Sequence, residues 1–326
     1  MSTVAYPCLM RGHEMQTAFS LPDQKLHRVD MPELHGNAFV ATPQGWILVV
    51  ANSDSAASLT YLLHPQTNSR VALPSLEDDL PEQRKCVLSG NDATVRGCGV
   101  LVLDMTSPAM WFCRIGGSRW SRHGYDIGCY NLPLSYCPVP KKRNIFDIAA
   151  VDGRFFFFES DTSSEVGTLD FTDDDPEPEA RMGAIAVPSL DDDFYGDRQQ
   201  MSAVLTYLVE SDGDLYLASV AFYGSCYDGP GTVRVYKMDF SASAWRRTED
   251  IGERAFLLGS PNFGASCSAS GHGLKPNCLY WVNCFSEEGS DLHVYDVKDG
   301  RLEIIEMFSE DASAAQRPFW IVPVAS

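Results

Sequence analysis

The sequence lacks the features that would direct the chain to a membrane or out of the cell. No run approaches the roughly 18 consecutive apolar residues of a membrane-spanning helix. The segment from Met1 to Met15 has no basic region followed by an apolar stretch, and no Asn-x-Ser/Thr acceptor occurs anywhere. We therefore expect a protein of the cytosol, the nucleus or both, with no membrane partner.

The chain also lacks the motifs of common enzyme and metal sites. It contains no P-loop, no GxSxG, no HExxH and no CxxC. The segment Gly271-His272-Gly273 is too short for a dinucleotide-binding fingerprint. Cys267 and His272 could form a nucleophile and base, but both fall in a Ser/Gly-rich segment that we expect to be a loop. We therefore expect no catalytic residue, no cofactor and no metal.

Cysteine is present, with ten residues, but not in the tight framework that staples small secreted domains. Free cysteine behaves as a small hydrophobic residue in apolar strands. Five cysteines lie within or beside such runs: Cys86, Cys98, Cys113, Cys278 and Cys284. This usage indicates a reducing compartment.

Positive charge is scarce. Lys and Arg total 25 against 44 Asp and Glu, which gives a formal net charge of −19 and argues against nucleic acid as a partner. Much of the acid lies in three runs that we expect in connections, at 77–79, 173–177 and 191–193. Such runs ordinarily aid solubility, and a site for a basic partner or a cation is the alternative. The run Asp191, Asp192 and Asp193, with Asp197 nearby, lacks the alternating ligands and central Gly of a helix-loop-helix calcium site.

Short runs rich in Val, Ile, Tyr, Phe and Trp recur along the chain and are separated by Gly, Pro, Asn and Asp, which is typical of β-strands and turns. The clearest unit contains 215–218, 233–238 and 245–247, and a second copy contains 278–282, 292–297 and 302–305. Alternation within Val233 to Met238 gives a strand two unlike faces. We therefore predict repeated four-stranded sheets.

The count of units predicts a closed six-bladed β-propeller, with 1–326 as a single domain. Five units are complete, at about 36–75, 84–123, 144–189, 202–251 and 255–309. The N-terminal piece, 5–31, supplies three further strands and the C-terminal piece, 317–324, supplies one. Joining the two ends in one sheet closes the ring without a long exposed edge. The tryptophans that we expect to pack between blades are Trp46, Trp120, Trp245 and Trp281.

A pair of β-sandwiches is the main alternative fold. It requires a linker near the middle of the chain, for which the acidic stretch from Asp173 to Glu179 is the candidate. Another strand-like run follows this stretch at once, so we interpret it as a loop inside a blade.

Several segments together resemble one known family: Gly45-Trp46, Leu62 to Thr67 with Val71 to Pro74, Val235 to Phe240 with Trp245, Ile251 to Gly259, and Gly273 to Tyr280. They resemble the plant F-box-associated propeller family of the KIB type, over nearly the whole chain from Pro7 to Pro323. The resemblance implies no catalytic residue. Many members carry an N-terminal F-box that docks on the Skp1 adaptor of a ubiquitin ligase, and their propeller is thought to recruit the substrate. Only a few residues precede the first expected strand here, which argues against Skp1 binding. Either the chain is a propeller-only member, or the F-box was lost or trimmed.

These observations favour a non-enzymatic, protein-binding platform. We expect the partner to dock on longer loops at a propeller rim, since rigid scaffolds carry function on their loops. The candidate residues are Phe222, Tyr223 and Tyr227 in a Gly-rich loop, with Asp191, Asp192 and Asp193 steering a basic partner. A propeller enzyme or carbohydrate-binding protein with a site in the central channel is the alternative, because acids from different blades can meet at the axis. A regulatory decoy that binds the family's targets without the ligase is a third.

Overall fold

The computed structural model describes twelve parts of the chain: residues 4–12, 16–51, 59–130, 141–158, 164–173, 177–188, 190, 201–223, 230–260, 262–282, 291–307 and 318–324. Within these parts the apolar runs form β-strands, and helix is limited to two short 3₁₀ segments, η1 (Pro32–Leu34) and η2 (Ser270–His272). No helix in the described parts is long and apolar enough to cross a membrane.

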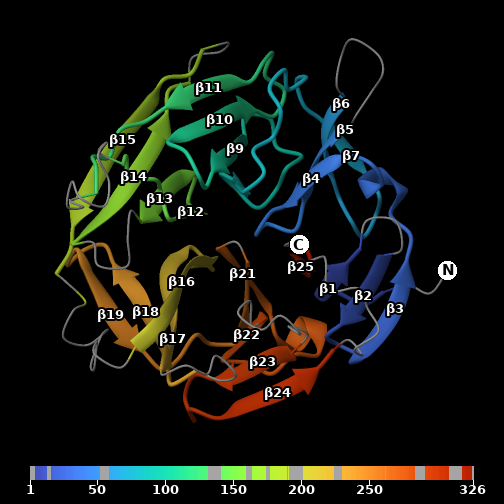
Figure 1. Ribbon diagram of the computed structural model, residues 1–326, viewed down its shortest axis with the longest axis vertical. Helices are drawn as coiled ribbons and strands as arrows, with labels where there is room; N and C mark the ends of the chain where they lie inside the picture. The colour runs from blue at the N-terminus through green and yellow to red at the C-terminus, as the bar shows by residue number, and fades with distance from the viewer. Residues whose placement is uncertain are drawn as a thin grey trace.

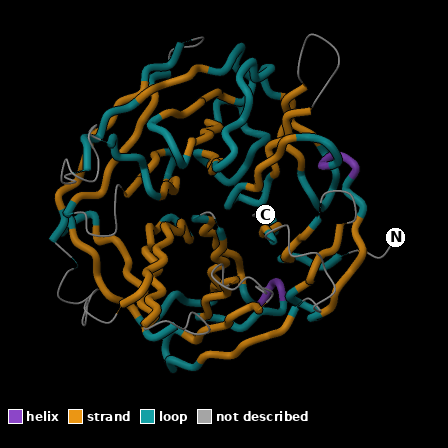
Figure 2. The backbone as a smooth tube through the Cα atoms, viewed as in Figure 1, coloured by secondary structure: helices purple, strands orange, loops and turns teal. Residues whose placement is uncertain are grey.

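The strands form six sheets arranged in a ring (Figures 1 and 2). Three sheets contain β4 (Ala38–Ala41), β5 (Ile47–Ala51), β6 (Leu59–Leu63) and β7 (Arg70–Ala72); β8 (Arg84–Leu88), β9 (Gly99–Asp104), β10 (Ala109–Arg114) and β11 (Ser121–Gly124); and β12 (Asp147–Val151), β13 (Arg154–Phe158), β14 (Glu165–Phe171) and β15 (Ala180–Ala186). The other three contain β16 (Met201–Ser211), β17 (Asp214–Tyr223), β18 (Thr232–Asp239) and β19 (Ala244–Thr248); β20 (Arg254–Gly259), β21 (Phe263–Ser268), β22 (Cys278–Val282), β23 (Asp291–Asp296) and β24 (Leu302–Glu306); and β25 (Phe319–Ile321), β1 (Cys8–Arg11), β2 (Gln16–Ser20) and β3 (Lys25–Val29).

This arrangement confirms the six-bladed β-propeller, and the pair of β-sandwiches is wrong. The innermost strands β4, β8, β12, β16, β21 and β25 lie around the axis, each in contact with the next blade. Buried apolar side chains of the described residues form six clusters, and each cluster lies between two neighbouring blades. The core is therefore distributed around the ring, as repeat architectures require.

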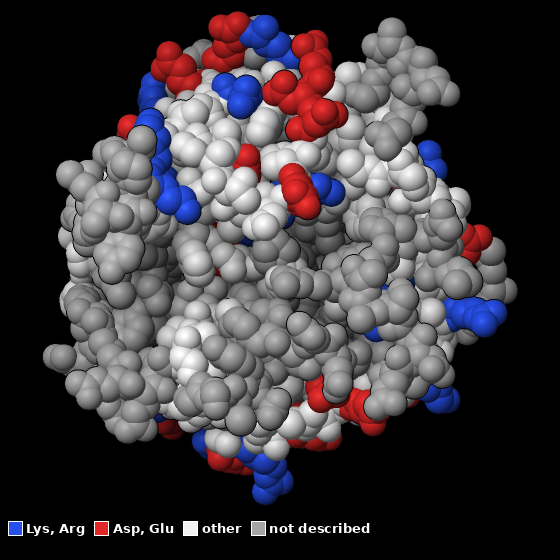
Figure 3. Space-filling model, in the orientation of Figure 1, with Lys and Arg blue, Asp and Glu red and all other residues white. Residues whose placement is uncertain are grey.

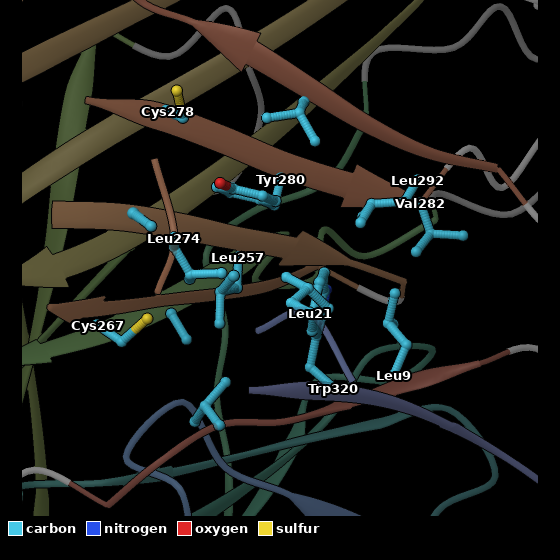
Figure 4. Close-up of a cluster of buried hydrophobic side chains, with 14 of the residues drawn as sticks. Leu9, Leu21, Leu257, Cys267, Leu274, Cys278, Tyr280, Val282, Leu292 and Trp320 are labelled. Atoms are coloured by element: carbon cyan, nitrogen blue, oxygen red, sulfur yellow. The ribbon is translucent and has the colours of Figure 1, made fainter. Parts of the chain in front are cut away.

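The predicted joining of the two chain ends in one sheet is also present. Strand β25 pairs antiparallel with β1, so that Leu9 lies opposite Trp320. The Trp320 indole Nε1 donates a hydrogen bond of 2.8 Å to the Leu258 carbonyl oxygen of the neighbouring blade. Figure 4 shows Trp320 beside Leu9 and Leu21, in the cluster that also contains Leu257. Apolar packing and a hydrogen bond thus close the ring.

The expected packing of tryptophans between blades is confirmed. Trp46, Trp245 and Trp281 are buried in three different clusters between blades. The ring of Trp245 stacks on Phe158 of the preceding blade at a centroid distance of 5.7 Å. Trp120 is half-buried and packs against the same cluster as Trp46.

One blade differs from the prediction, because its sheet has five strands. The segment around Cys267, expected to be a loop, forms β21, which pairs antiparallel with β20 and becomes the innermost strand. Strand β20 then pairs in parallel with β22. Gly264 makes this close approach possible, since a Cβ atom there would lie 2.5 Å from the Leu208 carbonyl oxygen. The small residues of β21 resemble the composition of a loop. The same small residues allow β21 to pack closely against β16.

Candidate functional site

A buried ion pair lies at the axis where the inner strands converge. Lys85 is the second residue of β8 and Asp147 is the first of β12, and they are 4% and 1% exposed. The Lys85 ammonium donates to Asp147 Oδ1. We call these two residues the axial ion pair.

Four blades meet at the axial ion pair. Asp147 Oδ2 accepts a 2.6 Å hydrogen bond from the Leu208 amide, and Oδ1 accepts one of 2.7 Å from Ile148. Lys85 Nζ donates to the Asn262 carbonyl oxygen at 2.7 Å. Burial raises the pKa of the Asp147 carboxyl, while Lys85 and the two amides act in the opposite direction. These contacts satisfy both buried charges.

The axial ion pair lies between two cavities at opposite ends of the channel. Strand β8 lines one cavity with its first two residues and the other with Val87 and Leu88. The C-terminal segment does the same, with Pro318 and Phe319 at one end and Pro323 and Val324 at the other. The propeller therefore has a cavity at each mouth of the channel.

The larger mouth, which we call the polar cavity, has a volume of about 670 Å³. Two Asp-Gly turns of neighbouring blades, at Asp152 and Asp212, reach it, together with Glu210 and Arg254. Both aspartates have positive φ, which is typical of two-residue hairpin turns. Its neutral polar lining includes Gln44, Gln66, Ser89, Asn91, Ser266, Ser268 and His272.

The charged groups of the polar cavity largely serve the fold around it. Glu210 Oε1 accepts a 2.9 Å hydrogen bond from the Gly213 amide, and burial raises the pKa of this carboxyl. Arg254 donates to Ser266 Oγ at 3.0 Å and lies 3.4 Å from an Asp212 carboxylate oxygen. Clustered carboxylates at the axis are what a channel site for a sugar or an enzyme requires, but no tryptophan is among the described residues that line the cavity.

The smaller mouth, which we call the aromatic pocket, has a volume of about 350 Å³. Phe39 and Phe319 come from the starts of two inner strands, and their ring centroids are 5.2 Å apart. Phe146, just before β12, is 39% exposed, and its carbonyl oxygen accepts a hydrogen bond from the Asn262 side chain. The described residues that line the pocket are Phe39, Val40, Ala41, Glu82, Gln83, Arg84, Lys85, Ser260, Phe263, Pro318 and Phe319.

Charged side chains are unevenly placed on the face seen in Figure 3. They gather at the top of the view, over the region where Figure 1 places β9, β10 and β11. The acidic run at 77–79, in the connection before β8, is exposed as expected. One of its members has a fixed contact, because Asp78 accepts a 2.6 Å hydrogen bond from the Trp111 indole.

The predicted aromatic binding loop needs correction. Strand β17 extends through Tyr223, so Phe222 and Tyr223 lie in a strand rather than a loop. Phe222 is fully buried in the cluster between the β16–β19 and β20–β24 sheets, where its apolar ring stabilises the core. Tyr223 is half-buried and its hydroxyl lies 3.2 Å from Thr232 Oγ1. The remaining candidates, Tyr227, Asp191, Asp192 and Asp193, lie outside the described residues.

Cys267 and His272 both line the polar cavity, but the thiol is not suited to nucleophilic attack. Cys267 is 4% exposed in β21, and burial raises its pKa to about 12. A reactive cysteine requires a lowered pKa, since the thiolate is the nucleophile. In the described parts, no group of three His, Cys, Asp or Glu side chains is placed to hold a metal ion.

The sequence interpretation missed the axial ion pair and the aromatic pocket. One signal was available, namely a charged residue near the start of an otherwise apolar run, in Lys85-Cys86-Val87 and in Asp147-Ile148-Ala149. A charge in an inner strand faces the axis or must be paired, which points to a partner in another blade. The arrangement of the blades in the ring decides which blade supplies that partner.

Comparison with known proteins places the chain among propellers. A family model described as the KIB1-4 beta-propeller matches residues 18–296. Comparison with curated proteins finds no match. Solved structures with a similar fold include a putative 6-phosphogluconolactonase from Bacteroides fragilis, at 11% identity and a TM-score of 0.46, covering 98% of this chain and 99% of that one.

Two further structures are similar at the same level. A functionally unknown protein from Desulfotomaculum acetoxidans has 10% identity and a TM-score of 0.43, covering 95% of this chain and 83% of that one. TolB from Acinetobacter baumannii has 12% identity and a TM-score of 0.42, covering 97% of this chain and 66% of that one. Similarity this low carries no argument about function.

Proposed function

The chain belongs to the KIB1-4 beta-propeller family, and from that premise we propose that it is a non-enzymatic protein-binding platform whose partner docks at the aromatic pocket. A propeller offers a rigid surface at each mouth of its channel. The aromatic pocket is the mouth with the composition of a protein-binding site, because binding hot spots are rich in aromatic residues.

One observation carries the proposal: phenylalanine side chains from three blades line the same mouth. Phe39 and Phe319 are half-buried beside each other, and Phe263 is 9% exposed. Many other aromatic side chains, such as Phe156 and Phe158, pack between blades, where burial stabilises the fold. The half-buried rings at this opening are stabilised further only if something covers them.

Substitution of a ring that lines the pocket tests the proposal. We expect Phe39→Ala to lose the proteins that co-purify with the wild-type chain from its native cells. Phe240→Ala is the control, because Phe240 lies away from the pocket and is 41% exposed in the turn between β18 and β19. If Phe39→Ala and the control recover the same partners as the wild type, the aromatic pocket is not the docking site.

The resemblance to F-box propellers leads to a finer proposal, that the partner is a target of a ubiquitin-ligase pathway in the cytosol or nucleus. In that setting the chain recruits a substrate, or it acts as a decoy that holds the substrate away from the ligase. Co-purification with Skp1 distinguishes the two roles, because a decoy should bind the target without Skp1.

A second candidate function, carbohydrate binding or hydrolysis, is favoured by one observation in the polar cavity. Burial raises the pKa of Glu210 in a cavity that also holds Asp152 and Asp212, and unequal carboxylates are the requirement of glycoside hydrolysis. A screen of monosaccharides and aryl glycosides, with Glu210→Gln as the inactive control, tests it. Equal signals from the two proteins would exclude this candidate.

A further inference from the structure

Arg84 is the positively charged group of the aromatic pocket that has no carboxylate partner among the described residues. Its guanidinium donates from Nη1 to the Pro81 carbonyl oxygen at 2.7 Å and from Nη2 to the Phe39 carbonyl oxygen at 2.6 Å. No carboxylate oxygen of the described residues lies within 4.0 Å of it. Lys85, the next residue, is by contrast paired with Asp147.

This half-buried charge is unusual in so acidic a chain. The chain carries 44 Asp and Glu residues, yet none of the described ones neutralises Arg84. Burial without a countercharge lowers the pKa of the guanidinium. The planar fork of arginine has five N–H donors and matches a carboxylate in a two-point contact, so Arg84 keeps donors for an anionic ligand.

The walls around Arg84 are apolar. Phe39, Phe263 and Phe319 lie on the pocket with Pro318. A cavity of about 350 Å³ accommodates one or two side chains and lies at the lower end of the size range of ligand pockets. Glu82 also lines the pocket and is exposed, so it opposes a group with two negative charges, such as a phosphate.

We propose that the aromatic pocket binds a segment of a partner protein that presents an apolar side chain next to a single carboxylate. The apolar side chain packs among Phe39, Phe263 and Phe319, and the carboxylate takes the free donors of Arg84. This inference rests on the proposed function and names the chemistry of the partner. The carboxylate is the C-terminal one of the partner, since a C-terminal apolar residue carries both groups and a cavity of about 350 Å³ accommodates one or two side chains.

Two small probes separate the charge from the apolar group. N-acetylphenylalanine has both, whereas N-acetylphenylalaninamide has the same ring without the carboxylate. In titrations of the full chain followed by NMR at constant ionic strength, we expect the acid to bind about tenfold more tightly than the amide, as for a hydrogen bond to a charged group. Equal affinities, or no binding of either probe, would overturn the inference.

Variants test whether the aromatic pocket is the origin of the tighter binding of the acid. Arg84→Gln retains a donor for the Phe39 carbonyl and should bind the two probes equally, whereas Arg246→Gln, an exposed arginine on β19, should keep the preference for the acid. Phe319→Ala should weaken both probes, which remains informative if Arg84→Gln folds poorly. The partner-recovery experiment with Phe39→Ala judges the proposed function separately, since it does not depend on which probe binds.

Discussion

Lys85 and Asp147 carry opposite charges at the centre of the ring, where water is excluded. A buried pair of this kind contributes little net stability, because desolvation offsets the Coulomb attraction. Removing one partner is different, since it leaves a charge buried without compensation. The hydrogen bonds from Leu208 and Ile148 to Asp147 also fix where the inner strands lie relative to one another.

We expect Lys85→Met to lower the free energy of unfolding by about 3–5 kcal/mol, because the Asp147 carboxylate is left without its cation. The double variant Lys85→Met/Asp147→Asn should cost less than Lys85→Met alone, since it removes both charges and keeps an oxygen acceptor for one of the two amides. Urea unfolding monitored by tryptophan fluorescence measures both.

Lys237→Met is the control for the axial ion pair. Lys237 pairs with Asp214 at 2.6 Å, but both side chains are more than 40% exposed, so the loss should stay within about 1 kcal/mol. Each single substitution, Lys85→Met and Asp147→Asn, has its own loss in the free energy of unfolding. If these two losses simply add in the double variant, the charges do not act as a pair.

Asp104 makes the stability of the fold depend on pH through the turn in which it lies. Burial alone would raise the pKa of this carboxyl, but hydrogen bonds from Ser107 and Thr106 together hold it below its ordinary value. A lowered pKa in the folded state means that ionised Asp104 stabilises the fold above its unfolded pKa of about 3.9. This contribution is lost as the pH falls through the lower, folded value.

We therefore expect Asp104→Asn to destabilise the protein by about 1 kcal/mol at pH 6, and by less at pH 3. Thermal unfolding of the wild type and the variant at both pH values measures the difference. A difference that grows towards pH 3 would contradict the lowered pKa.

Strand β25 is only three residues long, yet it closes the ring. Two contacts explain how so short an element holds. Trp320 is 1% exposed, and its indole donates to the Leu258 carbonyl oxygen of the next blade. Gly259 leaves space for the Trp320 indole, because a Cβ atom at Gly259 would lie 2.8 Å from Trp320 Cδ1. The strand is therefore held by its side chain as well as by its pairing with β1.

Trp320→Ala should lower the free energy of unfolding by about 3–5 kcal/mol, since it opens a cavity between two blades and leaves the Leu258 carbonyl without its donor. Trp120→Ala is the comparison, because Trp120 is half-buried beside an outer strand and should cost less than half as much. Denaturant unfolding of both variants gives the values, and equal losses would mean that ring closure does not depend on Trp320.

Six of the seven described cysteines are buried between blades around the ring. The seven described cysteines are free, and all but Cys129 are buried. Burial raises the pKa of Cys8 and of Cys267 to about 12 each, so these thiols are protonated at neutral pH and shielded from reagents. Their protection therefore reports that the ring is closed.

Under native conditions we expect iodoacetamide to label Cys129 well before Cys8, Cys86 or Cys267. All four should react once the chain is unfolded in urea, which controls for intrinsic reactivity. Peptide mapping by mass spectrometry measures the labelling of each site. Native labelling of Cys267 as fast as that of Cys129 would show that the polar cavity opens on the timescale of the reaction.

Local patterns predicted most of the fold. Alternation and turn residues identify the strands of each blade, because both are set by neighbours a few residues apart. The leftover strands at the two ends predicted the closing blade, since an open sheet edge is unfavourable. Errors arose where small residues resemble a loop, as in β21, and where an aromatic run continues a strand, as at Phe222.

The sequence by itself determined the strands, the number of blades and the joining of the chain ends. Only the tertiary structure decided which side chains meet at the axis. Lys85 bonds to Asp147, 62 residues away, and to Asn262, 177 residues away, because inner strands of different blades converge there. No local pattern encodes such a separation. The axial ion pair, the two mouths and the position of Arg84, which has no carboxylate partner among the described residues, are therefore properties of the ring.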